Sequence, residues 1–124
     1  MKVKAGKSVL TTNIYRDIVS FLNSYIECHR NMEKHYRDVG GRMLMEYLTE
    51  GVLLTRKVYD EKDNNKKLEY ALLLKEKMRD CEVLLATLSD VRALSLKSSG
   101  HLSGEIGETM IQIDSWINSL SKKC

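Results

Sequence analysis

The feature of this chain that most restricts its fold is a row of apolar residues near the C-terminus that recurs in steps of four and three. These residues are Leu102, Ile106, Met110, Ile113, Ile117 and Leu120. Because an α-helix turns once in about 3.6 residues, this spacing places all six side chains on one helical face. A seam of this kind favours lengthwise packing against neighbouring helices. The sequence therefore predicts a helix over residues 103–121, with Ser103 as its N-cap.

Three further segments carry apolar residues at helical spacing. They predict helices over residues 12–31, 41–60 and 65–95, with Thr12 or Asn13 as the cap of the first. Proline is absent, and no long alternation of apolar and polar residues indicates a strand. At 124 residues the chain fits one domain. We therefore expect a single all-α domain over residues 1–124, folded as an antiparallel up-down-up-down four-helix bundle.

The stretch "MEKHYRDVGGRM", residues 32–43, combines a glycine pair with a cluster of cations. Glycine marks turns and helix ends, so Gly40 and Gly41 are predicted to form the junction between the first and second helices. In this interpretation one glycine relaxes the turn and the other permits close backbone approach. A Walker-type phosphate loop is excluded, because it needs more glycines and a following Lys-Ser or Lys-Thr pair.

The cations near this junction are the candidate nucleic-acid-binding residues. The net charge is only +3, but residues 1–42 hold eight Lys and Arg against four Asp and Glu. Arginine suits phosphate, since its planar guanidinium group donates two hydrogen bonds at once. The candidate residues are Arg30, Lys34, Arg37 and Arg42. The alternative is a solvated helix end, whose cations interact favourably with the negative C-terminal end of the helix dipole. A second basic group, Lys2, Lys4 and Lys7, fits either a partner contact or a disordered tail.

Other classes of chemistry find no support in the sequence. Cys28, Cys81 and Cys124 form an odd, widely spaced set, which indicates reduced thiols rather than disulfides. Cys81 is expected to pack in the core and Cys124 to be exposed. No zinc-ligand spacing, nucleophile motif or paired-carboxylate pattern occurs, so we expect no metal, no cofactor and no enzymatic activity. No apolar run is long enough for a membrane span and no secretory leader is evident, which favours the cytoplasm.

Glycines in the last helix point to an interface. Glycine inside a helix costs up to about 1 kcal/mol relative to alanine, so close helix–helix contact is the expected compensation. Gly104 and Gly107, with Trp116 on the same helix, are therefore the candidate residues of an oligomer interface, although Trp116 also suits the core.

Together these features resemble a known family over about residues 14–121. The stretches that carry the resemblance are "IYRDIVSFLNSYI", "MEKHYRDVGGRM" and "EIGETMIQIDSWINSL". The family contains the accessory variability determinant (Avd) proteins of diversity-generating retroelements and the related ribosomal-RNA intervening-sequence proteins. Met32 stands where the family often has proline.

The resemblance implies several properties that the residue patterns alone do not. Avd proteins are not enzymes; they form homopentamers with basic surfaces and associate with a reverse transcriptase and its template RNA. We therefore expect an oligomeric accessory protein, most simply a homopentamer, that binds RNA or a reverse transcriptase and takes no small-molecule substrate. The alternative is a structural or protein-interaction scaffold of the intervening-sequence type, with no direct nucleic-acid role.

Overall fold

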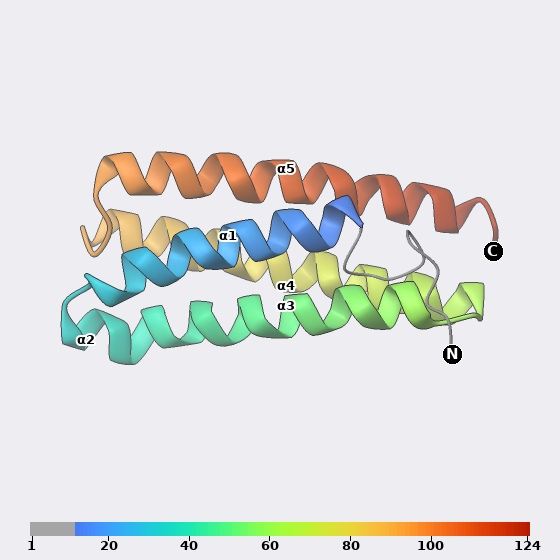
Figure 1. The fold of residues 1–124 in the computed structure, drawn as a ribbon, viewed down its shortest axis with the longest axis horizontal. Coiled ribbons are helices and arrows are strands. Elements are labelled where there is room, and N and C mark those ends of the chain that lie inside the picture. Colours follow the sequence, from blue (N-terminus) through green and yellow to red (C-terminus); the bar gives the residue numbers. More distant parts are fainter. Residues whose placement is uncertain (1–11) are drawn as a thin grey trace, which may run out of the picture.

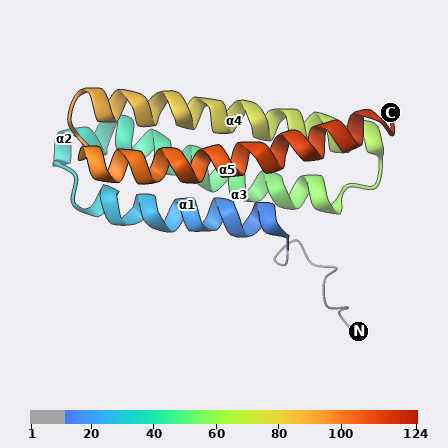
Figure 2. The ribbon, with the colours of Figure 1, turned by 90° about the horizontal axis from the view of Figure 1, so that it is seen from above.

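A computed structural model describes residues 12–124, and all regular structure in this part of the chain is helical. The helices are α1 (Asn13–Arg30), α2 (Lys34–Tyr36), α3 (Arg42–Asp60), α4 (Asn64–Asp90) and α5 (Leu96–Ser121). A π-helical turn, Arg37–Gly41, joins α2 to α3. The four long helices pack against one another (Figure 1 and Figure 2). The prediction of an all-α fold with four packed helices is therefore confirmed for the described residues.

Side-chain caps fix three of the helix starts. The Thr12 hydroxyl accepts a hydrogen bond from the Tyr15 N–H at 3.2 Å, which confirms the predicted cap of α1. Asp63 caps α4 by accepting from the N–H of Asn65 at 3.2 Å, and Ser95 caps α5 by accepting from Ser98 N–H at 3.1 Å.

The predicted start of the last helix at Ser103 is wrong, because α5 already begins at Leu96. Ser95 supplies the cap that was assigned to Ser103, and the buried Leu94 and Leu102 anchor the chain on both sides of the first turn. The residues between them are mostly polar or small, so the segment has little apolar periodicity and resembles a loop in sequence.

The prediction that Gly40 and Gly41 form the first helix junction is also wrong. The chain turns at residues 31–33 instead, where the Met32 side chain is only 5% exposed. Helical backbone resumes at Lys34, well before the predicted start at residue 41. Gly41 itself has helical dihedral angles, φ −62° and ψ −42°. Tertiary packing around the glycines therefore overrides their weak intrinsic preference for helix.

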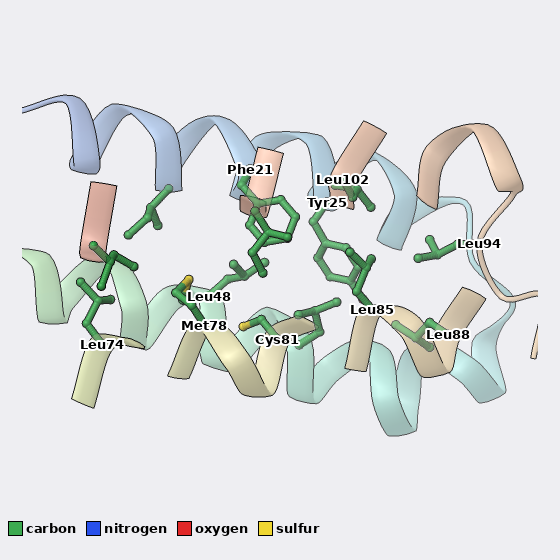
Figure 3. Packing of buried hydrophobic residues seen from close by; sticks show 14 of the residues in the cluster. Phe21, Tyr25, Leu48, Leu74, Met78, Cys81, Leu85, Leu88, Leu94 and Leu102 are labelled. Atoms are coloured by element: carbon green, nitrogen blue, oxygen red, sulfur yellow. The ribbon is translucent and has the colours of Figure 1, made fainter. Parts of the chain in front are cut away.

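The core lies between the four long helices and draws on each of them (Figure 3). Its fully buried residues include Phe21, Tyr25, Leu48, Met78, Cys81 and Leu102. Cys81 packs as a small apolar residue, as predicted, and burial raises the pKa of its thiol to about 12. Its side chain therefore remains a protonated thiol at neutral pH. Cys124 is exposed, also as predicted.

The connections lie at the two ends of the molecule (Figure 1 and Figure 2). The turn at residues 31–33, α2 and the α4–α5 loop at residues 91–95 share one end. The α3–α4 turn at residues 61–63 and the C-terminus share the other. There the Lys67 ammonium group donates to the carbonyl oxygens of Val58 at 2.6 Å and Tyr59 at 3.1 Å, and so caps the end of α3. Within residues 12–124, no helix has the length and apolar character needed to cross a membrane.

Candidate nucleic-acid interface

Three of the four predicted nucleic-acid-binding residues gather around Asp38, at the α2 end of the bundle. The Lys34 ammonium nitrogen lies 2.9 Å from one Asp38 oxygen, and Arg42 Nη2 lies 3.5 Å from the other. The hydrogen bond from Lys34 lowers the pKa of the Asp38 carboxyl below its ordinary 3.8, and the charges of Arg42 and Arg37 act in the same direction. Asp38 therefore stays ionised and attracts several cations to one place.

These ion pairs leave the cations accessible. The side chains of Lys34 and Arg42 are 80% and 63% exposed. Exposed pairs spaced four apart on a helix contribute little to stability, so a phosphate can replace the carboxylate at little cost.

Arg37 is the third member of this cluster and is held differently. Its side chain is half-buried, and its Nε atom is buried with no hydrogen-bond partner among the described residues. No ion pair within residues 12–124 involves Arg37, although its charge acts on both Asp38 and His29. Among the four predicted residues, Arg37 is therefore the one without an ion-pair partner in residues 12–124.

Arg30 lies in the last turn of α1, and its own helix supplies its partner. Its guanidinium nitrogen is 2.7 Å from a Glu27 carboxylate oxygen, and both side chains are about two-thirds exposed. The structure does not pair Arg30 with the Asp38 cluster. We use the name basic end surface for Arg30, Lys34, Arg37 and Arg42 together, with Asp38 at its centre.

The π-helical turn sets the geometry beneath this surface. The Tyr25 hydroxyl, from α1, donates a hydrogen bond of 2.9 Å to the carbonyl oxygen of Gly41. Burial raises the pKa of this hydroxyl, so it stays a donor at every physiological pH. The same hydroxyl lies 3.4 Å from Nδ1 of His29. Because π-helical turns often accompany functional sites, the turn is consistent with a binding role for the surface above it.

The sequence contained a signal for this turn that the glycine pair obscured. From Gly41, the last residue of the π-helical turn, into α3, the buried residues follow steps of three and four: Gly41, Leu44, Leu48, Gly51, Thr55 and Val58. The preceding inward residue, Tyr36, is five positions before Gly41. A spacing of five in an otherwise regular helical pattern indicates one inserted residue, which is how a π-helical turn arises.

The three predicted interface residues do not lie on one surface. A Cβ atom added to Gly104 or Gly107 would meet nothing within 4 Å, and the same holds for Gly100. At 3.6 residues per turn these three glycines fall within about 60° of one another, a stripe that we call the glycine face of α5. Trp116 instead packs, half-buried, against the core. It lies about 120° around the helix from Gly104.

A groove between α3 and α4 was not predicted. It has a volume of about 320 Å³ and is lined by Glu50, Leu53, Leu54, Lys57, Leu73 and Lys77. Leu53 and Leu73 are each 55% exposed. Apolar side chains exposed side by side mark surfaces that bind other proteins.

Two further expectations concern residues elsewhere in the chain. Lys2, Lys4 and Lys7, the second basic group, lie outside the described residues. Within residues 12–124, no group of three or more His, Cys, Asp or Glu side chains is placed to hold a metal ion.

The chain was compared with family models, curated proteins and solved structures. No family model, no curated protein and no solved structure matches the chain.

Proposed function

We propose that this chain is a non-enzymatic accessory protein that forms a homo-oligomer and binds RNA, a reverse transcriptase or both, as Avd proteins do. In this proposal it acts in the cytoplasm as a pentamer and needs no cofactor, metal ion, membrane or small-molecule substrate. The proposed subunit is an antiparallel up-down-up-down bundle. Short connections at residues 31–33, 61–63 and 91–95 support that topology, since short loops join antiparallel neighbours.

One observation carries the RNA-binding part of the proposal. Lys34, Arg37 and Arg42 are gathered around a single carboxylate on an accessible end of the bundle. Each exposed cation that contacts a phosphate releases condensed counterions from the nucleic acid, which makes binding favourable and sensitive to salt. The three cations therefore supply positive charge, and the side chains of Lys34 and Arg42 supply the exposure that a phosphate backbone requires.

Titration with RNA at several salt concentrations tests this role. We expect the combined variant Arg30→Ala, Lys34→Ala, Arg37→Ala and Arg42→Ala to stay folded but to bind RNA weakly. Each lost phosphate contact should also make the plot of log affinity against log salt shallower by about 0.7 for a single strand.

A matched control removes four cations from the opposite end of the molecule: Lys62→Ala, Lys66→Ala, Lys122→Ala and Lys123→Ala. All four of these side chains are exposed. The control has the same net charge as the first variant, so it reports how far binding depends on total charge alone. If the two variants bind RNA with the same affinity and the same salt dependence, the basic end surface is not the binding site.

A protein-interaction scaffold of the intervening-sequence type is the second candidate function. The exposed leucines of the α3–α4 groove favour it, because an apolar groove suits a protein partner rather than a phosphate backbone. The same titration distinguishes the two functions. A wild-type protein that binds no RNA even at low salt would support the scaffold.

A further inference from the structure

Arg92 has a backbone conformation that arginine rarely adopts. Its φ is +63°, and it is the only non-glycine residue with positive φ among the described residues. The residue directly follows Val91, the C-cap of α4. The N–H of Arg92 donates to the carbonyl of Ser89 at 3.0 Å, and the N–H of Ala93 donates to the carbonyl of Leu88 at 2.8 Å. These two bonds form a Schellman motif with Arg92 at its left-handed position.

Glycine is the residue best suited to that position. The left-handed region is costly for L-residues with a Cβ atom, and glycine occupies it freely. An arginine at this position therefore carries strain that glycine would avoid. Within residues 12–124 no contact of the side chain offsets that strain, since the Arg92 side chain is exposed and makes no ion pair or hydrogen bond there. Backbone strain of this kind is concentrated at functional sites.

The loop that holds Arg92 packs directly on the elements that carry the basic end surface. The Tyr36 hydroxyl, from α2, lies 3.4 Å from the carbonyl oxygen of Val91 and donates to it. A Cβ atom on Gly40, in the π-helical turn, would lie 3.4 Å from Leu88 Cδ2. Both views of the fold place α2 and the α4–α5 loop at the same end (Figure 1 and Figure 2). Tyr36 and Val91 are in contact, and each is followed directly in the sequence by an arginine: Arg37 follows Tyr36, and Arg92 follows Val91.

We propose that Arg92 is a fifth phosphate-binding residue and that the RNA surface extends from the π-helical turn across to the α4–α5 loop. Arg92 holds an exposed guanidinium group just beyond the end of α4, where no ion-pair or hydrogen-bond partner within residues 12–124 competes for it. A guanidinium group binds phosphate through two parallel hydrogen bonds, so an arginine without an ion pair in the described residues, at the same end of the bundle as Lys34, Arg37 and Arg42, fits an RNA backbone. This inference rests on the RNA-binding function proposed above.

Substitution of Arg92 by glycine gives the test two readouts of opposite sign. We expect Arg92→Gly to raise the melting temperature by about 2–6 °C, since it relieves the left-handed strain. We expect the same variant to bind poly(U) RNA several-fold more weakly, with a salt dependence shallower by about 0.7. Arg92→Lys keeps the charge and the strain, so it should melt like the wild type and retain most of the affinity.

The control is Arg79→Ala, which removes an exposed cation from the middle of α4 and changes the net charge by the same amount. If Arg92→Gly and Arg79→Ala bind poly(U) equally well at every salt concentration, Arg92 is not part of the surface, whatever its effect on stability. That result, together with weak binding by the four-site variant of the basic end surface, would overturn only this inference. Absence of RNA binding by the wild type would overturn the proposed function and this inference with it.

Discussion

Gly40 and Gly41 are adjacent in the π-helical turn, yet their surroundings tolerate a side chain to very different degrees. A Cβ atom on Gly41 would lie 3.0 Å from the carbonyl oxygen of Tyr36, 3.1 Å from the sulfur of Met32 and 3.3 Å from Nδ1 of His29. On Gly40 it would meet only Leu88, at an ordinary contact distance of 3.4 Å. Of the two roles predicted for the pair, close backbone approach therefore applies to Gly41, and the junction role applies to neither.

We expect Gly41→Ala to lower the free energy of unfolding by about 1–3 kcal/mol, because the added methyl group overpacks a filled site. Gly40→Ala should be neutral or should stabilise the protein by up to about 1 kcal/mol, since alanine is the better helix former. Urea denaturation of the two single variants measures both values. Equal effects of the two substitutions would contradict the packing described for Gly41.

His29 makes stability depend on pH below the neutral range. Burial of the ring lowers its pKa below the ordinary 6.5, and the nearby charges of Arg37 and Arg42 lower it further, against an opposing effect of Asp38. The unfolded chain therefore binds a proton at this residue at a higher pH than the folded chain does. It follows that the free energy of unfolding falls as the pH drops from 6.5 toward the lower pKa of the folded state.

We expect His29→Gln to remove part of this pH dependence. Chemical denaturation of the wild type and the variant between about pH 7.5 and 5 measures it, because the slope of stability against pH counts the protons taken up on unfolding. If both proteins lose stability equally across this range, His29 is not the group responsible.

At the scale of the elements, the sequence predicted the regular helices well and the irregular helix starts poorly. The predicted range 12–31 agrees with α1, Asn13–Arg30, to within one residue at each end, because strong apolar periodicity identifies such a helix. The predicted range 65–95 begins one residue after the start of α4, Asn64–Asp90, but ends five residues too late. The starts of α5 and of the helical path through α2 were missed. In both places glycine or serine residues weakened the local pattern, and tertiary contacts of Met32, Tyr25 and Leu94 decided the outcome.

Part of the candidate site could likewise be predicted from the sequence, and part could not. The cations Lys34, Arg37 and Arg42 follow one another closely in sequence, so their proximity could be predicted from spacing alone. Arg92 is fifty residues farther along the chain, and tertiary contacts such as that between Tyr36 and Val91 bring its loop to the same end of the bundle. A left-handed backbone at an arginine has no sequence signature.

At the scale of the elements, our testable prediction concerns the glycine face of α5. Gly104 and Gly107 have open space around them, so Gly104→Ala and Gly107→Ala together should stabilise an isolated subunit by up to about 1 kcal/mol per site. If a neighbouring subunit packs closely on this face, the same two methyl groups should weaken the assembly. Thermal unfolding and light scattering at matched concentrations report the two effects separately. A variant that is more stable and equally oligomeric would show that the glycine face is not the interface.

At the scale of the whole molecule, the basic end surface occupies one end of an elongated bundle (Figure 1). A single copy offers RNA only a few phosphate contacts, which gives weak binding at physiological salt. A closed ring of identical subunits would present several copies of this surface to one strand, and each contact after the first would become intramolecular. The proposed RNA binding should therefore be stronger if the chain assembles.

We expect light scattering of the wild type to give a mass of five times the 14.3 kDa of one subunit. We further expect a variant that dissociates, with the basic end surface intact, to bind long RNA at least about 100-fold more weakly. A short RNA that can reach only one subunit should bind the assembled and dissociated proteins alike, because it gains nothing from neighbouring copies. A monomeric wild type at micromolar concentration would contradict the assembly. Equal loss of affinity for short and long RNA would instead show that the substitutions disturb the binding surface itself.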